Sequence, residues 1–385
     1  MMKTNLTYYL VSLLTVIGML TACTEDSTLP PSSQEKEEGR VILSYTVDGS
    51  SIVATRAPEE DEAGNQGRNE NLVKELDLFI FPTDNSKPIH VSATDVEYTD
   101  YNDPQDKTTY KAWDTGLSPD DIQNGDQVYL VANCHNAVSD VKTLEELKTK
   151  TIGGLICYNK QDQFVMDGKV TIEASMWTDK DLHIQINLKR AAAKVRLHFA
   201  SSTDWKQVSY RFCHYAHTAT VLEQGETEEY TYVNDLVLTD YPTEENQLTT
   251  ATTITENGTK CLVLYTYPNN WYSGNGNPED DHLNVAPPIN SDRETRILLR
   301  APFDGKLYYY DIPVNFRLPL ENDATEIKFE DYKDLYRIQR NHIYDITVTI
   351  DRAGGITEGD PETPVLQYEV APYDDTWDVD VPAFN

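Results

Sequence analysis

Apolar residues recur at every second position in many segments of this chain. In residues 41–47 the side chains of Val41, Leu43, Tyr45 and Val47 fall on one side. A period of two is typical of a strand that turns one face to a core. Residues 76–81 are apolar almost throughout, which favours a central strand covered on both faces. The predicted strands are 41–47, 76–81, 128–132, 183–188, 194–199, 231–238, 261–267, 295–300, 307–316, 341–350, 365–370 and 376–381.

Short strands separated by clusters of turn residues indicate β-sandwiches. The one clear helix signal is Thr143 followed by Glu146, a capping box that predicts a short helix ending near Lys150. A length of 385 residues favours two domains. We therefore predict an all-β chain with two tandem β-sandwich domains and a boundary in the short link 189–193. The predicted parts are a signal 1–23, a tether 24–40, an N-terminal domain 41–189, a C-terminal domain 190–354 and a tail 355–385.

The N-terminus has the features of an export signal. Lys3 precedes an apolar stretch, 8–19, which is too short for a stable membrane-spanning helix and is typical of a signal peptide. Residues 20–23 (LTAC) match the lipobox of bacterial lipoproteins, so Cys23 is predicted to carry a lipid and to become the mature N-terminus. The alternative is a plain secretory signal in which Cys23 is incidental. We expect an exported, surface-exposed protein that its lipid tethers to the outer membrane.

Arg56 lies between the first strand and the acidic segment 57–71, which offers almost nothing to a core. An arginine in such a loop is open to a trypsin-like protease. Cleavage between Arg56 and Ala57 would detach strand 41–47. The domain would then expose an apolar groove and unpaired edges, which another strand can fill. Val41, Leu43, Tyr45 and Val47 are the predicted displaced strand.

The C-terminal tail offers two further alternating segments. Leu366, Tyr368 and Val370 align in the first, and Trp377, Val379 and Val381 align in the second. Pro372 separates the two segments and resets their register. One interpretation is a terminal hairpin folded onto its own domain. The other is a donor strand that enters the groove of the next subunit.

The formal charge of −32 argues against partners that are nucleic acids or anionic membrane surfaces. Beyond Cys23 the chain has Cys134, Cys157, Cys213 and Cys261, and the exported compartment permits disulfides without fixing their pairing. The Cys-His dipeptides 134–135 and 213–214 lack the spacing of a zinc site. We therefore expect no metal.

Motifs for catalysis are missing from the sequence. It contains neither G-x-S-x-G nor a phosphate-binding P-loop, and 64 carboxylates make close acid pairs inevitable by chance. We expect no enzyme activity and no cofactor. Trp271 and Tyr272, with the Gly- and Asn-rich 273–277, could form a loop that contacts carbohydrate, although a plain exposed turn is the simpler interpretation. This loop is the basis of an alternative function, a non-polymerising surface lipoprotein that binds a glycan or a host protein.

The chain resembles the Bacteroidales fimbrillins, the subunits of type V pili. The resemblance implies two transthyretin-like β-sandwiches, surface delivery as a lipoprotein, cleavage by an arginine-specific protease and strand exchange with other fimbrial subunits. Residues 268–270 (PNN) depart from a Pro-Glu-Asn turn that members often have. The pilus anchor subunit is an alternative, but anchors keep their lipid and tend to lack the arginine, so a stalk or tip subunit is favoured. The segments that carry the resemblance are the lipobox, 54–57, 71–81, 188–195, 340–348 and the tail around Trp377. Residues 24–26 (TED) resemble the surface-export signal of Bacteroidetes lipoproteins.

Overall fold

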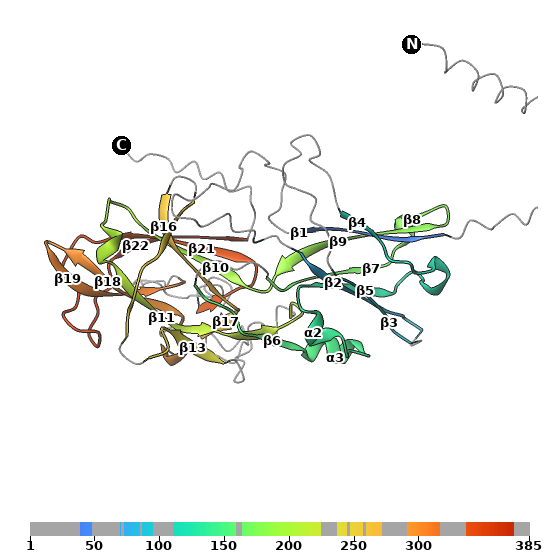
Figure 1. The fold of residues 1–385 in the computed structure, drawn as a ribbon, viewed down its shortest axis with the longest axis horizontal. Coiled ribbons are helices and arrows are strands. Elements are labelled where there is room, and N and C mark those ends of the chain that lie inside the picture. Colours follow the sequence, from blue (N-terminus) through green and yellow to red (C-terminus); the bar gives the residue numbers. More distant parts are fainter. Residues whose placement is uncertain are drawn as a thin grey trace, which may run out of the picture. The chain divides into compact units, whose positions relative to one another are not determined.

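The computed structural model describes most of the chain after the predicted tether (Figure 1). The predicted lipidation residue Cys23, the cleavage residues Arg56 and Ala57, and Trp377, Val379 and Val381 lie outside the described residues. By its contacts the chain divides into the units Met1–Glu38 and Gly39–Asn385. The described residues are 39–47, 70, 73–84, 87–94, 111–158, 164–224, 237–244, 247–256, 259–271, 291–315 and 336–372.

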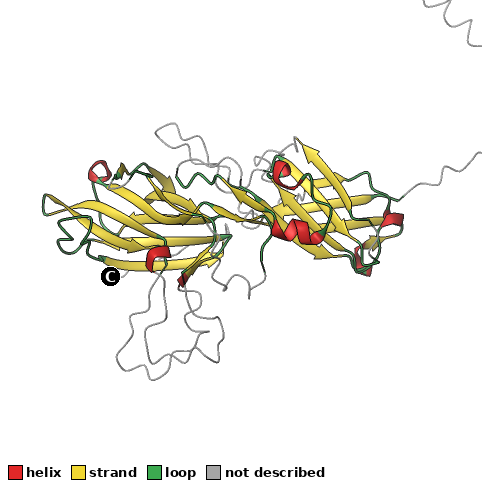
Figure 2. Ribbon diagram, turned by 90° about the horizontal axis from the view of Figure 1, so that it is seen from below, coloured by secondary structure: helices red, strands yellow, loops and turns green. Residues whose placement is uncertain are grey.

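The described part is built almost entirely from strands, which confirms the all-β prediction (Figure 2). Its short α-helices are α2 (His135–Val138) and α3 (Leu144–Thr149). The strands are β1 Val41–Val47, β2 Glu75–Phe81, β3 Ile89–Thr94, β4 Lys111–Asp114, β5 Gln127–Ala132, β6 Thr151–Gly153, β7 Met166–Thr171, β8 Trp177–Thr178, β9 Asp181–Arg190, β10 Ala193–Phe199, β11 Ser209–Ala216, β12 Thr218–Thr220, β13 Leu238–Tyr241, β14 Thr249–Thr250, β15 Thr253–Glu256, β16 Thr259–Thr266, β17 Asn269–Asn270, β18 Arg296–Phe303, β19 Lys306–Pro313, β20 Arg337–Ile338, β21 His342–Thr349 and β22 Val365–Pro372.

Helix α3 begins at the predicted capping box. The Thr143 hydroxyl accepts a hydrogen bond from the backbone N–H of Glu146 at 3.2 Å. The Glu146 carboxylate accepts from the backbone N–H of Lys142 at 2.7 Å, one residue earlier than in the usual box. Lys150, which follows the last helical residue, has an extended backbone and ends the helix where the sequence predicted.

The first half of the described chain forms one sheet with the strand order β3-β2-β5-β7-β9-β1-β4, and β8 pairs with β9. The side chains of strand β2 are buried from Leu76 to Phe81, as predicted for a strand covered on both faces. Its two edges pair with β3 and β5. Strand β9 alternates between buried and exposed residues, with Ile184, Ile186 and Leu188 buried. These side chains belong to the first hydrophobic core.

The second half forms a β-sandwich. One sheet has the order β15-β16-β10-β21-β22, and the other has β13-β11-β18-β19 with β14 paired to β11. Side chains of both sheets, among them Val195, Phe212, Leu264 and Tyr310, form the second hydrophobic core. Of the predicted strand 231–238, residues 231–236 lie outside the described part, and β13 begins at Leu238.

Segments from the two halves of the sequence cross between the cores. Strand β6 pairs with β12, and Tyr158 forms a β-bridge with Leu264. Leu155 belongs to the first core and Cys157 to the second. The link between β9 and β10 consists of two buried alanines, so no flexible linker separates these strands. The division of the chain into domains 41–189 and 190–354 stays a prediction.

A buried ion pair ties the two halves together. The guanidinium of Arg340 lies 2.5 Å from the carboxylate of Asp167, and both side chains are buried. Arg340 also donates to the carbonyl of Val221, and Asp167 accepts from the backbone N–H of Glu223 at 2.9 Å. Burial raises the pKa of Asp167, and the charge of Arg340 acts against that rise. The charged form of Asp167 therefore depends on the guanidinium of Arg340 beside it.

We expect Arg340→Met to lower the free energy of unfolding by about 3 to 5 kcal/mol, because it leaves the Asp167 carboxyl buried without its partner. Urea unfolding followed by tryptophan fluorescence measures this difference. The control is Lys148→Ala, which removes an exposed pair with Glu145 and should change stability by less than about 1 kcal/mol. Equal effects of the two substitutions would show that the Arg340 pair does not stabilise the fold.

Candidate strand-exchange site

Strand β1 lies inside the first sheet, not at its edge (Figure 1). It pairs in parallel with β9 over its whole length, from Val41 opposite Leu182 to Val47 opposite Leu188. On its other side it pairs antiparallel with β4, which the sequence analysis missed because four residues are too few to show a clear alternation. In the described residues β4 has no other strand partner, so removal of β1 would free both β4 and an edge of β9.

The side chains of β1 divide between core and surface as the sequence predicted. Those of Val41, Leu43, Tyr45 and Val47 are all buried in the first core, and the residues between them are half-buried. Burial raises the pKa of Tyr45 to about 12. Full burial contributes roughly 1.5–3 kcal/mol for each large apolar side chain. Loss of β1 would therefore leave a long apolar groove.

Strand β22 contains the first predicted donor segment and forms an edge of its own sheet. It pairs antiparallel with β21, from Thr349 opposite Val365 to His342 opposite Pro372. Leu366 and Tyr368 pack against the second core, and the Tyr368 hydroxyl donates to the carbonyl of Pro313 at 2.7 Å. In the structure this segment therefore lies on its own sheet, as one half of the predicted terminal hairpin would.

The binding of β22 is weaker than that of β1 by two measures. The Val370 side chain is 42% exposed, whereas the four inward side chains of β1, those of Val41, Leu43, Tyr45 and Val47, are at most 6% exposed. Glu369 lies directly opposite Asp345 of β21, and like charges in that position are destabilising. The outer edge of β22 has no strand partner among the described residues. These features place β22 among the more easily released strands.

Asp345 is held by two basic side chains of β10. Arg196 forms an ion pair with its carboxylate, and Nδ1 of His198 lies 3.1 Å from Oδ1. Burial acts to raise the pKa of Asp345, but the hydrogen bond from His198 and the charge of Arg196 outweigh it and lower the pKa. The carboxylate form is therefore favoured by folding, and the cluster fixes β21, on which β22 rests.

The amino-acid sequence of this chain is similar to that of a fimbrial protein. FimD, the major fimbrium tip subunit of Porphyromonas gingivalis, is 25% identical to it over 322 residues. The match covers 79% of this chain and 40% of FimD, so the chain spans about two fifths of the length of this relative. The chain is a relative of fimbrial subunits. No family profile matches it.

A solved structure shares the fold of this chain. The solved structure of Mfa3, a tip fimbrial protein from Porphyromonas gingivalis with a C-terminal truncation, aligns with a TM-score of 0.51. The alignment covers 87% of this chain and 99% of that one, at 10% sequence identity. Such a low identity shows a shared fold alone.

The alternative site at Trp271 is not supported. Its side chain is fully buried in the second core, and its backbone N–H donates to the carbonyl of Tyr336. Strand β17, just before it, pairs with β20 and directs the ring inward. Trp271 is therefore unable to contact a glycan, and the prediction of an exposed Trp271 was wrong. The rest of that loop, from Tyr272 on, lies outside the described residues.

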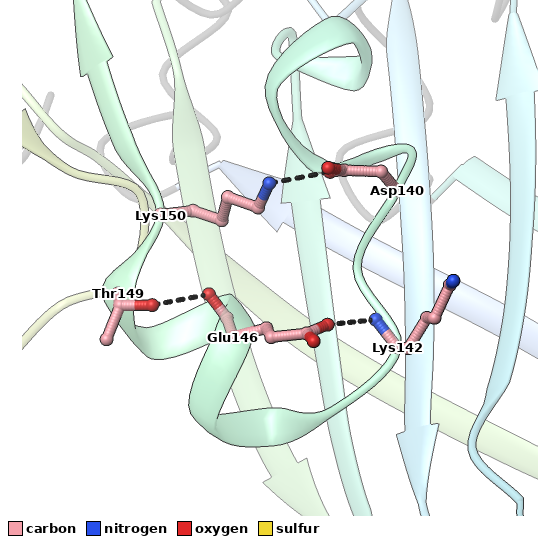
Figure 3. A pocket seen from close by; sticks show the side chains of 5 residues that line it. All are labelled: Asp140, Lys142, Glu146, Thr149 and Lys150. Carbon is pink, nitrogen blue, oxygen red and sulfur yellow. Dashed lines mark hydrogen bonds and ion pairs between the residues drawn. The ribbon is translucent and has the colours of Figure 1, made fainter.

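The described residues include four of the chain's cysteines and a depression beside α3. The structure describes Cys134, Cys157, Cys213 and Cys261 and joins none of them by a disulfide. Within the described ranges no group of three His, Cys, Asp or Glu side chains could hold a metal, and no helix is long and apolar enough to cross a membrane. Figure 3 shows a shallow depression beside α3. Its drawn contacts are the ion pair of Lys150 with Asp140, the hydrogen bond from the Lys142 N–H to the Glu146 carboxylate, and the one from the Thr149 hydroxyl to the Glu146 carbonyl.

Leu43→Ala should lower the free energy of unfolding by about 2 to 5 kcal/mol, because it opens a cavity under a fully buried side chain. Ser44→Ala is the matched control on the opposite face of β1 and should change it by no more than about 0.5 kcal/mol. Chemical denaturation of the uncleaved protein measures both. A small effect of Leu43→Ala would mean that β1 leaves its groove without cleavage.

Asp345→Asn should destabilise the protein at pH 7 and much less in acid. The lowered pKa means that this carboxylate contributes stability above its ordinary value of 3.8, and that the contribution is lost as the pH falls through the lowered pKa. The difference in urea midpoint between wild type and variant should therefore shrink between pH 7 and pH 3. A difference that does not change with pH would contradict a charged Asp345 in the folded state.

Proposed function

We propose that this chain is a structural subunit of a fimbria, supports adhesion and is assembled by strand exchange. The observation that carries the proposal is the position of β1. The first described strand lies between two others of its sheet, β9 and β4, and residues 48–69 connect it to the remainder of the chain. A cut in that connection turns an internal strand into a separable peptide. The similarity to FimD supports a fimbrial role.

In the proposed route the precursor is exported as a lipoprotein through Cys23 and reaches the cell surface. An arginine-specific protease cleaves after Arg56 and separates β1 from the subunit. The C-terminal segment of another subunit then enters the groove between β9 and β4. Until cleavage β1 occupies that groove and blocks assembly. The partners are therefore other fimbrial subunits, the protease and, before maturation, the outer membrane.

Within the fimbria we propose the tip position. FimD and Mfa3 are both named as tip proteins, and neither name describes a stalk or an anchor. The proposed role is structural, without catalysis or a cofactor. The competing function, a glycan-binding lipoprotein that does not polymerise, loses its candidate residue because Trp271 is buried.

Cleavage of the purified precursor and electron microscopy test the assembly. The cleaved wild-type subunit should form strand-exchanged oligomers, alone or with a companion fimbrial subunit. The triple variant Trp377→Asp, Val379→Asp and Val381→Asp should remain folded and fail to assemble. The control is Asp378→Asn with Asp380→Asn, which alters the other face of the same segment and should assemble normally. Normal assembly of the triple variant would exclude residues 377–381 as the donor.

A cross-link tests the part played by β22. Thr347 and Gln367 are direct cross-strand neighbours, so Thr347→Cys with Gln367→Cys should form a disulfide that holds β22 on β21. If β22 is donated, oxidation should abolish assembly and reduction should restore it. Assembly of the oxidised variant would restrict the donor to residues after 372. Immunogold label at fimbrial ends supports the tip position, and label along the length supports a stalk.

A further inference from the structure

Two arginines bracket β1. Arg40 stands immediately before the strand, and Arg56 follows it. Cleavage after Arg56 removes the tether together with β1. Cleavage after Arg40 would remove the tether and leave β1 in its groove, which would release a subunit that is closed to a donor strand. An arginine-specific protease would therefore open the groove by cutting after Arg56 and leave it closed by cutting after Arg40.

The backbone at Arg40 is already part of the sheet. Its N–H donates to Oδ1 of Asp181 at 2.9 Å, and its carbonyl accepts from the N–H of Leu182 at 2.8 Å. The carbonyl of Val41 accepts from the backbone N–H of Thr115 at 3.1 Å and from the Thr115 hydroxyl at 2.9 Å. Residues on both sides of the Arg40–Val41 bond are therefore held by hydrogen bonds.

Packing adds to this protection. The Cα of Gly39 lies so close to the backbone of Lys180 that a Cβ would come within 2.1 Å of its carbonyl oxygen. On the other side of the bond the Val41 side chain is fully buried. The Arg40 side chain itself is 60% exposed, with a guanidinium nitrogen 3.5 Å from Oδ2 of Asp181. A protease could reach the arginine side chain, but not the peptide bond behind it.

Proteases bind the residues around the scissile bond as an extended strand, and a strand within a sheet has to leave it first. Cleavage of a folded protein therefore follows the population of the locally opened form. Opening at Arg40 would pull Val41 out of the core and break its bonds to β9 and Thr115. Asp181 accepts from both the N–H and the guanidinium of Arg40.

We propose that the contacts of residues 39–41, centred on Asp181, shield the Arg40–Val41 bond, so that an arginine-specific protease removes the tether and β1 in one piece. This inference rests on the proposed function, in which loss of β1 opens the groove. Asp181 thereby acts as a positioning residue that determines which arginine is used.

Initial rates of cleavage of the full precursor by an arginine-specific endoprotease test the proposal. Mass spectrometry separates the N-terminal fragment that ends at Arg40 from the one that ends at Arg56. In the wild type the fragment ending at Arg56 should appear first. Asp181→Ala should raise the rate at Arg40 about tenfold, because a hydrogen bond to a charged group is lost. Arg40→Gln in the Asp181→Ala background should remove the new fragment.

The matched control is Glu173→Ala, an exposed acid in the same half of the chain with no hydrogen bond to β1, which should leave both rates unchanged. The thermal midpoint of each variant shows whether faster cleavage comes from global unfolding. Cleavage of the wild type after Arg40 as fast as after Arg56 would overturn the proposal, as would an unchanged rate in Asp181→Ala. Resistance at Arg56 would contradict the proposed function instead, and the comparison of Asp181→Ala with Glu173→Ala would still decide the shielding.

Discussion

The rest of the structure depends on the burial of β1 between β9 and β4. Four apolar side chains at alternate positions enter the first core, and each edge of the strand is hydrogen-bonded to a neighbour. Apolar burial and main-chain pairing therefore act on the same seven residues. A groove shaped for this strand can also take another strand with the same alternation, and the proposed exchange rests on this complementarity. Exchange is opposed by β1 itself, which already fills this groove with its side chains and its main-chain hydrogen bonds.

In the proposed fimbria, tension on a subunit acts on the groove in its first core and on its C-terminal segment. A subunit loaded in this way needs a firm connection between its two cores. Two features supply that connection. The first is β-pairing across the halves, between β6 and β12 and at Tyr158. The second is the Arg340–Asp167 pair, which is buried and surrounded by backbone donors and acceptors. Buried pairs of this kind lose much free energy when one partner is missing, so they favour one relative arrangement of the segments that carry them.

The strands at the two ends of the described chain, β1 and β22, differ in how firmly they are held. β1 is internal and fully buried, and its start is fixed by Asp181. β22 lies at an edge, exposes Val370 and places Glu369 opposite Asp345. β1 is paired on both edges, whereas β22 is paired with one neighbouring strand among the described residues. The firmly held β1 and the less firmly held β22 agree with the proposed order, in which cleavage releases β1 before a C-terminal segment is exchanged.

The sequence by itself indicated part of the strands, such as β1, β2 and β9, and the apolar side of those that alternate, because alternation is a local property with a period of two. It also located the helix cap at Thr143, where the partners are three residues apart. It did not indicate β3, β4, β7 or β11. It could not determine that β1 lies parallel to β9, since residues such as Arg40 and Asp181 are 141 positions apart and pair only after folding. It also could not determine the inward direction of Trp271, because an aromatic residue beside a polar loop has no local signal of burial. Partners and burial were decided by the tertiary structure alone, since both depend on distant segments that fill the same core.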